Sequence, residues 1–346
     1  MLWQDDNGVD SDAGSTPRWT TMNTTWPANA DPTVLRLGAH VGQQNMRMDE
    51  MRTLWRRLDA RLDWISCWDH LYEAPPAGGT LDHFEALTVL GALAASTERV
   101  RVGCLVFYVG YRSPGVLAKA ATTLDHISGG RFDLGLGSGW HEPEARAFGY
   151  PFPSVKTRFD MLDEAATIIR SLLTNERTTF TGEHFAVDDA SCLPRPIQAR
   201  LPIWIGGAGE QRTLRLVAKH ADGWNVPYIT PEEYERLNGV LDDRCAEIGR
   251  DPSTVRRTIN LMFNLQSTSA AAEAEVERLR GAWGPAFDRV TGGALLGTPD
   301  QAIERIRAYR SAGAQDINIA LRAPWDEGAL RTYLEEVVPA AKADNA

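Results

Sequence analysis

Short apolar runs alternate with amphipathic segments along most of the chain. Residues 100–106 form an apolar run that is too short for a helix and rich in β-branched residues, as in a strand buried on both faces. Ser113 then supplies a helix N-cap and Pro114 a first helical residue, and apolar positions keep a helical period until Gly129. Residues 132–137 form the next buried strand. This segment predicts two parallel strands joined by a helix.

The same alternation extends on both sides of this segment. Further strands are predicted at residues 35–40, 62–68, 203–207, 221–226, 257–265 and 316–321. Further helices are predicted at residues 49–61, 81–95, 158–173, 211–220, 230–249 and 298–313, the last two beginning with matching Thr-Pro capping sequences. An insertion at residues 178–202, a hairpin followed by a proline-punctuated loop, separates the fourth helix from the fifth strand.

Eight strands that alternate with helices, with no charged linker between them, predict one α/β domain, a (β/α)8 TIM barrel, rather than two domains. We expect this domain to occupy residues 34–346. Residues 1–33 are polar and show no period, so we expect an N-terminal extension that is poorly ordered or wraps the surface.

Composition narrows the class of protein. A net charge of −10 argues against sequence-independent binding of nucleic acid, which needs a basic surface. The four cysteines are scattered without metal-binding spacing, and no apolar run approaches the roughly 18 residues of a membrane span. The N-terminus lacks the pattern of a secretion signal. The sequence therefore predicts a cytoplasmic protein without a metal site.

Candidate site residues follow two of the predicted strands, with Asp69 and His70 expected to be catalytic and His40 expected to bind a cofactor. Asp69 and His70 lie just past the second strand, where a barrel places its reactive groups, and His40 ends the first strand. A carboxylate beside a histidine is suited to moving a substrate proton or orienting a ring, with Asp69 orienting His70. The alternative is a histidine that only caps a helix or satisfies a loop. We interpret His184 and His220 as structural.

Two glycine-rich loops are candidate cofactor sites. Gly206, Gly207, Ala208, Gly209 and Glu210 join the fifth strand to a helix, whose N-terminus favours a phosphate, with Arg212 as an added cation. The alternative is a tight turn without a ligand.

The second loop follows the fourth strand. Here Gly139 precedes Trp140 and His141, and the indole is suited to stacking on a planar ring unless it packs under the loop. Glu142 and Glu144 come next, and we expect them to be exposed carboxylates in the first turn of a helix. The alternative is that they act as acids or bases.

Several longer motifs together resemble the luciferase-like monooxygenase superfamily. They are SPGVLAKAATTLDHISGGRFDLGLGSGW, EARAFGYPF, RFDMLDEA, FTGEHFAVDD, LPRPIQARLPIWIGGAGEQRTLRLVAKHADGWN and GTPDQAIERIRAYRSAG, in family order over residues 35–322. The sequence from Gly209 to Thr213, with Ala221 and Asp222, is most similar to the actinobacterial branch of coenzyme F420 (deazaflavin)-dependent oxidoreductases.

The resemblance implies a barrel that buries a deazaflavin ring at its strand C-terminal mouth. It implies a non-proline cis peptide near Leu105 and Val106 under that ring, and it places Asp69 and His70 beside the ring. Some relatives have a proton-donating glutamate where this chain has Trp140, so that role is unassigned.

The activity implied is hydride transfer between coenzyme F420 and a small organic substrate. The alternatives are an FMN-dependent monooxygenase and, from another class, a non-catalytic flavin-binding protein. A barrel enzyme that acts on sugar phosphates without a flavin is a weaker alternative. A homodimer is a family-level expectation, and the substrate does not follow from the resemblance.

Overall fold

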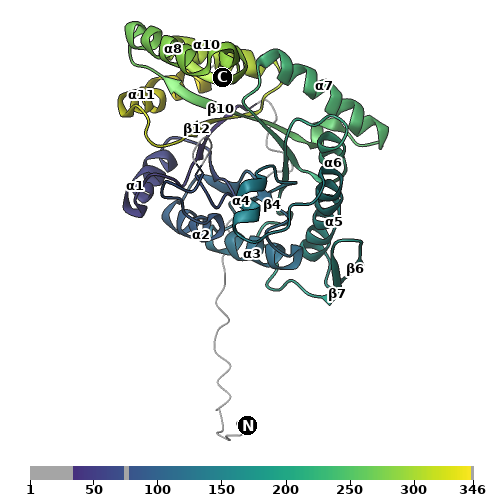
Figure 1. Ribbon diagram of the computed structural model, residues 1–346. Coiled ribbons are helices and arrows are strands. Elements are labelled where there is room, and N and C mark those ends of the chain that lie inside the picture. The colour runs from purple at the N-terminus through teal and green to yellow at the C-terminus, as the bar shows by residue number, and fades with distance from the viewer. Residues whose placement is uncertain (1–33, 74–77, 344–346) are drawn as a thin grey trace, which may run out of the picture.

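The computed structural model describes residues 34–73 and 78–343, in which eight parallel strands close into a barrel ringed by helices (Figure 1). The barrel strands, in chain order, are β1 (Arg36–Val41), β2 (Trp64–Cys67), β3 (Arg101–Cys104), β5 (Phe132–Gly137), β8 (Ile203–Gly206), β9 (Gly223–Pro227), β10 (Arg256–Leu265) and β12 (Asp316–Leu321). Pairing of β9 with β10 and of β12 with β1 completes the closure. The predicted TIM barrel is confirmed. The predicted extension at residues 1–33 lies outside the described residues.

Four further strands of the described chain lie outside this ring of eight. Strand β4 (Phe107–Tyr108) pairs with β5, and β11 (Ala294–Gly297) pairs with β10. The predicted insertion after the fourth helix is confirmed as an antiparallel hairpin of β6 (Thr178–Thr181) and β7 (Ala186–Ala190) at the outer edge of the molecule (Figure 1).

The longer helices around the barrel include several that bury an apolar face against it. The bounds of the described α-helices are α1 (Met48–Asp59), α2 (Ala86–Ser96), α3 (Pro114–Ile127), α4 (Glu142–Ala147), α5 (Val155–Thr174), α6 (Thr213–His220), α7 (Pro231–Glu247), α8 (Ser269–Trp283), α9 (Phe287–Thr291), α10 (Pro299–Ser311), α11 (Glu327–Thr332) and α12 (Val338–Ala343). Helix α1 is typical, because Met51, Leu54, Trp55 and Leu58 recur at helical spacing and all are buried. The predicted capping residue Thr230 accepts a hydrogen bond from the Glu233 N–H.

Some boundaries differ from those predicted. Helix α2 begins at Ala86 rather than at residue 81, because the Glu85 carboxylate caps it and the Phe84 N–H donates to Gln43 in the loop after β1. Helix α6 begins at Thr213, so Arg212 is its N-cap residue and not one turn inside it. The short helix α4, the segment from α8 to β11 and the C-terminal helices were not predicted.

Large and small residues alternate inside the barrel, which is how its interior is filled. The Trp204 ring packs so closely on Gly223 that a Cβ there would lie 2.2 Å from it, and a Cβ on Gly38 would lie 2.2 Å from Asn318 Oδ1. The rings of Trp64 and Trp204 lie 5.0 Å apart in this layer. The barrel is therefore a packed core, and ligand space is left at its ends.

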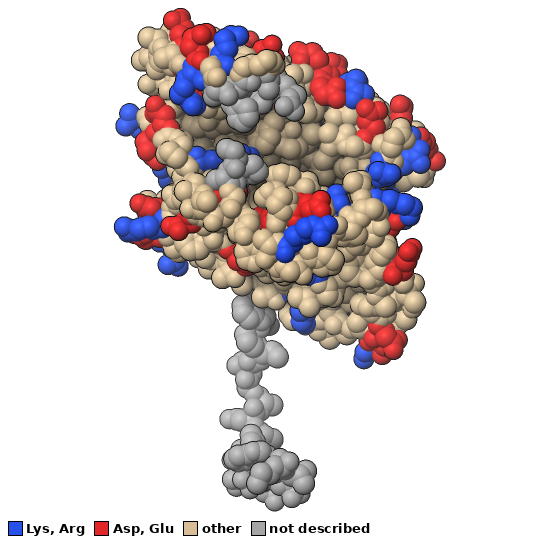
Figure 2. Space-filling view, viewed as in Figure 1, with Lys and Arg blue, Asp and Glu red and all other residues tan. Residues whose placement is uncertain are grey.

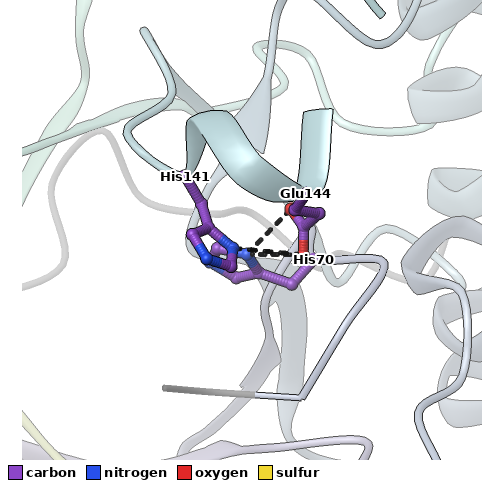
Figure 3. A group of neighbouring side chains, drawn as sticks. All are labelled: His70, His141 and Glu144. Carbon is purple, nitrogen blue, oxygen red and sulfur yellow. Dashed lines mark hydrogen bonds and ion pairs between the residues drawn. The ribbon is translucent and has the colours of Figure 1, made fainter. Parts of the chain in front are cut away.

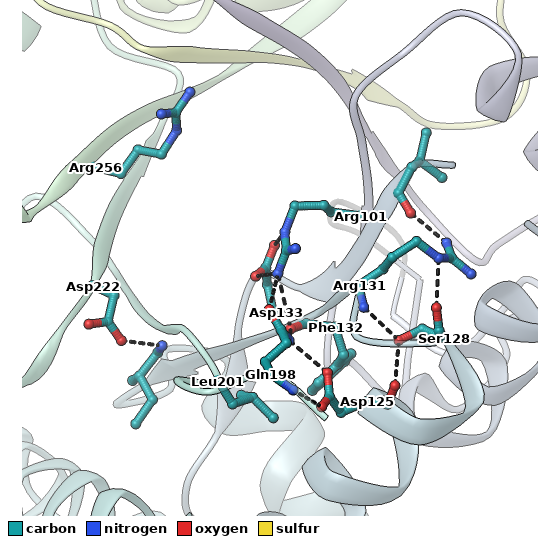
Figure 4. A network of polar contacts seen from close by, with 12 residues as sticks. Arg101, Asp125, Ser128, Arg131, Phe132, Asp133, Gln198, Leu201, Asp222 and Arg256 are labelled. Carbon is teal, nitrogen blue, oxygen red and sulfur yellow. Dashed lines mark hydrogen bonds and ion pairs between the residues drawn. The ribbon is translucent and has the colours of Figure 1, made fainter. Parts of the chain in front are cut away.

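Arginine–aspartate pairs close the N-terminal end of the barrel. Asp316 on β12 accepts paired hydrogen bonds from Arg36 and from Arg256, with distances of 2.6–2.8 Å. Asp133 on β5 binds Arg101, which also donates to Gln198 (Figure 4).

Across the described residues, no helix is long and apolar enough to span a membrane.

Candidate active site

The candidate site lies at the strand C-terminal end of the barrel, where Figure 2 shows a central hollow bordered mostly by uncharged residues. His40, the next-to-last residue of β1, is buried there, and its Nδ1 lies 2.9 Å from the Ser66 hydroxyl of β2. Burial, together with the charges of Arg322 and His70, lowers the pKa of His40 to about 3. His40 is therefore a neutral hydrogen-bonding group near pH 7.

His70 is held by a carboxylate from another loop. Its Nδ1 lies 3.1 Å and 3.2 Å from the two carboxylate oxygens of Glu144 on α4 (Figure 3). The same carboxylate accepts the N–H groups of Leu71 and Tyr72, each at 2.9 Å, and the Tyr111 hydroxyl at 2.7 Å. Glu144 thus joins the loop after β2 to the loop after β5.

The expectation that Glu144 is exposed was wrong, because its side chain is only 1% exposed. Glu142 is exposed as expected and pairs with Arg146. Burial opposes ionisation of Glu144, yet hydrogen bonds from His70, Tyr111 and the Tyr72 N–H outweigh it and lower its pKa to about 2. An ionised carboxylate can only accept, so His70 presents its proton at Nδ1 and leaves Nε2 for a ligand.

Asp69 does not orient His70, contrary to the expectation from their adjacency. Its Oδ2 accepts from the Tyr108 N–H at 3.0 Å and from Arg112 Nη1 at 2.7 Å. Burial raises the pKa of Asp69 despite the neighbouring Arg112. Its buried Oδ1 has no hydrogen-bond partner among the described residues, so this oxygen is suited to a donor on a ligand.

The loop after β5 presents an exposed aromatic surface. Gly139 has φ +73° and packs on the Tyr108 ring, where a Cβ would lie 2.6 Å away. Trp140 is 62% exposed and stacks on His141 at 4.9 Å, with its edge contact to His70 at 5.3 Å. The indole is not packed under its loop and remains available to a planar ligand.

The floor of the mouth contains the peptide bond singled out by the family resemblance. The Leu105–Val106 bond is cis, as expected. The Val106 side chain packs against Gly135, Gly137 and Gly206, at each of which a Cβ would lie 3.0 Å or less from it. Three barrel positions therefore lack side chains where Val106 lies.

Most N–H groups of the loop from Gly206 to Arg212 are not used in hydrogen bonds among the described residues. The Gly207 N–H donates to the Asn225 carbonyl, whereas no partner is recorded among the described residues for the N–H groups of residues 208–212. The Glu210 side chain binds Arg236 at 2.9 Å on the surface. Arg212 lies 5.9 Å from the Phe159 ring. The loop therefore keeps free N–H groups, and its carboxylate is occupied elsewhere.

His70, His141 and Glu144 also bring three ligand atoms within 4.8 Å of one another, as a metal site would (Figure 3). Both Glu144 oxygens are already hydrogen-bonded, whereas His141 Nδ1 lies 3.6 Å away and has no partner among the described residues. We therefore interpret the cluster as a device that orients His70.

Sequence reasoning missed Glu144, Tyr111 and Arg112 in this site. Glu144 lies 74 positions from His70, and its first-turn position gave the pattern of a surface carboxylate. No local signal distinguishes it from Glu142.

The model of the family described as luciferase-like monooxygenase matches residues 36–316. The chain belongs to this family. It is 33% identical over 305 residues to the F420-dependent glucose-6-phosphate dehydrogenase of Microbacterium testaceum, an alignment that covers 80% of this chain and 88% of that protein.

Solved structures share the fold of this luciferase-like chain. An F420-dependent secondary alcohol dehydrogenase with an F420–acetone adduct has a TM-score of 0.78 and 20% identity, covering 89% of this chain and 99% of its own. The FMN complex of the oxygenating constituent of 3,6-diketocamphane monooxygenase from Pseudomonas putida has a TM-score of 0.68 and 17% identity, covering 88% and 98%.

Proposed function

We propose that the chain is an oxidoreductase that transfers hydride between coenzyme F420 and a small organic substrate at the strand C-terminal mouth. The observation that carries this proposal is His70, fixed by ionised Glu144 with its Nε2 left for a ligand, in a chain 33% identical to an F420-dependent dehydrogenase. A protein that only stores a flavin has no use for a histidine oriented in this way.

The residues of the mouth fit a flat ring that carries a phosphate chain. Val106 and the glycines around it offer an apolar floor, Trp140 an exposed indole, and Asp69 Oδ1 a buried acceptor for a ring N–H. The free N–H groups of residues 208–212, before the N-terminus of α6, suit the phosphate. When bound, the deazaflavin supplies the carbon that accepts or donates hydride.

The protein's own residues handle the proton. As hydride leaves the carbon of a substrate alcohol, the hydroxyl proton passes to His70 Nε2, and the reverse holds for reduction of a carbonyl. Ionised Glu144 stabilises the imidazolium that forms, because it accepts a hydrogen bond from the Nδ1–H group. Neutral His40 and buried Asp69 are further polar groups of the same mouth.

An FMN-dependent monooxygenase is the second candidate. It is favoured by the family's description and by the FMN complex that shares this fold. The loop at residues 206–212 would fit the phosphate of either cofactor, so the loop does not discriminate between them.

The deciding measurement compares the affinities of the purified protein for F420 and for FMN by ring fluorescence. We expect tight binding of F420 and poor binding of FMN. Equal or tighter binding of FMN, together with oxygen-dependent turnover, would overturn the proposal in favour of the monooxygenase.

The phosphate assignment needs a variant that leaves the loop intact. Gly207 has φ +129° and a Cβ would lie 3.3 Å from Thr213, so Gly207→Val would distort the loop whatever it binds. Ala208 is exposed, and Ala208→Asp adds a negative charge that Ala208→Asn, of equal size, does not. We expect only the Asp variant to weaken F420 strongly, with little change for the phosphate-free deazaflavin. Equal losses for both ligands would place the phosphate elsewhere.

A further inference from the structure

Arg322 lies over the mouth of the barrel. It directly follows β12, which lies between β10 and β1 in the ring of strands. Its guanidinium carbon is 5.5 Å from the centre of the Trp68 ring, after β2, and 5.6 Å from that of Tyr228, after β9. These rings follow strands two places away on opposite sides of β12. The guanidinium must therefore project inward, between the two rings.

Both rings, which we call the aromatic clamp (Trp68 and Tyr228), are fixed by their own contacts. The Trp68 indole N–H lies 3.0 Å from His83 Nε2, and the ring packs on Gly42, where a Cβ would lie 2.1 Å away. Tyr228 has φ +60°, a left-handed conformation that a bulky residue rarely adopts, and its hydroxyl accepts from Arg322 at 3.1 Å. Such backbone outliers are concentrated at functional sites.

The charge of Arg322 is not neutralised by any residue that the structure describes. Arg112, at the same end of the barrel, binds both Asp69 and Glu85, and Arg36 at the other end binds Asp316. Arg322 is exposed, and among the described residues no carboxylate lies within ion-pair distance of it. A guanidinium has five N–H donors, and only one hydrogen bond is recorded here. In a protein of net charge −10, a guanidinium placed in this way is suited to binding an anion.

We propose that Arg322, held in the aromatic clamp, binds an anionic oxygen group of the substrate, which is therefore a carboxylate or phosphate ester. The Tyr228 hydroxyl accepts from Arg322 and can donate its own proton to the same anion. His40, which is neutral, lies at the end of β1, and His70 follows β2, so both lie on that side of the clamp. The substrate therefore reaches from Arg322 toward His70. That the molecule carrying this anionic group is the substrate rests on the proposed function.

The test is calorimetric titration of the F420-saturated protein, at low ionic strength, with inorganic phosphate in one arm and acetate in the other. The variants are Arg322→Gln, Arg322→Lys and, as a control, Arg61→Gln, an exposed arginine that precedes β2 at the opposite end of the barrel. We expect Arg322→Gln to weaken the preferred anion roughly tenfold or more, the usual loss for a charge-assisted hydrogen bond. Arg322→Lys should lose less and Arg61→Gln nothing.

Three outcomes would overturn the proposal. They are unchanged affinity in Arg322→Gln, no binding of either anion to the unmodified protein, and anion binding that disappears once F420 is added. The last would assign Arg322 to the cofactor's own phosphate or carboxylates. Failure of F420 to bind would contradict the proposed function instead, and the cofactor-free protein would still report whether Arg322 holds an anion.

Discussion

The two ends of the barrel differ in how their charged and polar groups are paired. At the N-terminal end, Asp316 is 2% exposed and binds Arg36 and Arg256, so each charge has its counter-charge within the fold. At the C-terminal end, Asp69 Oδ1 and His141 Nδ1 are buried without a hydrogen-bond partner, and Arg322 has no carboxylate within ion-pair distance, among the residues that the structure describes. The charged groups at the N-terminal end are paired within the fold, whereas these polar groups at the C-terminal end remain available to ligands.

The N-terminal end also shows what counter-charges do for a buried carboxylate. Burial opposes ionisation of Asp316, but Arg36 and Arg256 outweigh it and hold its pKa below the usual range. Asp133 is equally buried and has Arg101 as its ion-pair partner, and there burial prevails, so its pKa is raised. Two arginines therefore lower the pKa of a buried aspartate, whereas a single ion-paired arginine does not offset the effect of burial.

The largest effect we expect is on stability, from Asp316→Asn. This change leaves Arg36 and Arg256 buried without their counter-charge and should cost about 3–5 kcal/mol in the free energy of unfolding, measured in urea. The folded-state pKa of Asp316 is lowered, so ionised Asp316 stabilises the fold fully at a pH above the usual pKa of aspartate. This stabilisation declines as the pH falls from there toward the folded-state pKa. The variant and the unmodified protein should therefore converge in stability at acidic pH.

Asp133→Asn is the matched control for this prediction. Arg101 would keep its contacts with the Gln198 side chain at 2.9 Å and the Phe132 carbonyl at 3.4 Å, so the loss should be smaller. An equal loss for both variants would contradict the view that the pair of arginines makes Asp316 special.

The next effect belongs to the other end of the barrel. His70→Ala should lower kcat by about 10²–10⁴-fold, the range for one positioned acid or base, while the Kd for F420 barely changes. Steady-state kinetics and fluorescence titration measure the two quantities. A kcat within about threefold of the unmodified protein, far short of that range, would make His70 structural.

Glu144→Gln should have an intermediate effect. A neutral amide cannot stabilise the imidazolium of His70, so we expect kcat to fall roughly tenfold to a hundredfold, as where a carboxylate orients a histidine. The acidic limb of the pH profile of kcat/KM should also move to lower pH, which a purely structural loss would not produce. An unchanged profile would contradict the positioning role.

The smallest effect should come from Trp140→Ala. The side chain is 62% exposed, so stability should not change, while lost stacking of about 0.5–1.5 kcal/mol should weaken F420 severalfold. Phe148→Ala, which removes an exposed aromatic at the other end of α4, is the control and should leave F420 affinity unchanged. The reverse ranking would move the ring site away from Trp140.

The sequence was sufficient for the barrel because its strands are continuous apolar runs bounded by clear helix caps. Residues 132–137, for example, coincide with β5, and Thr230 caps α7 as predicted. The sequence did not predict α8 and β11 within residues 269–297, because α8 lacks a strongly apolar face. The family assignment is also confirmed, because it depended on several motifs in fixed order.

The site was only partly predictable. Position after a strand was enough to select His70, because every barrel strand delivers its last residues to the same mouth. Adjacency suggested Asp69 as its partner, but neighbouring residues need not share a direction, and the carboxylate came from Glu144 instead. Arg322 is a single arginine after a strand, and only closure of the barrel brings it between Trp68 and Tyr228.

The Glu144 carboxylate has a consequence for how such a protein can diversify. By fastening residues 70–72 and Tyr111 to α4, it joins the residues proposed to handle the proton into one unit built from three loops. Arg322 and Tyr228 belong to two other loops, which do not contribute to that unit. Evolution or engineering can therefore exchange the loops after β9 and β12, and with them the preferred substrate, while the chemistry is inherited unaltered.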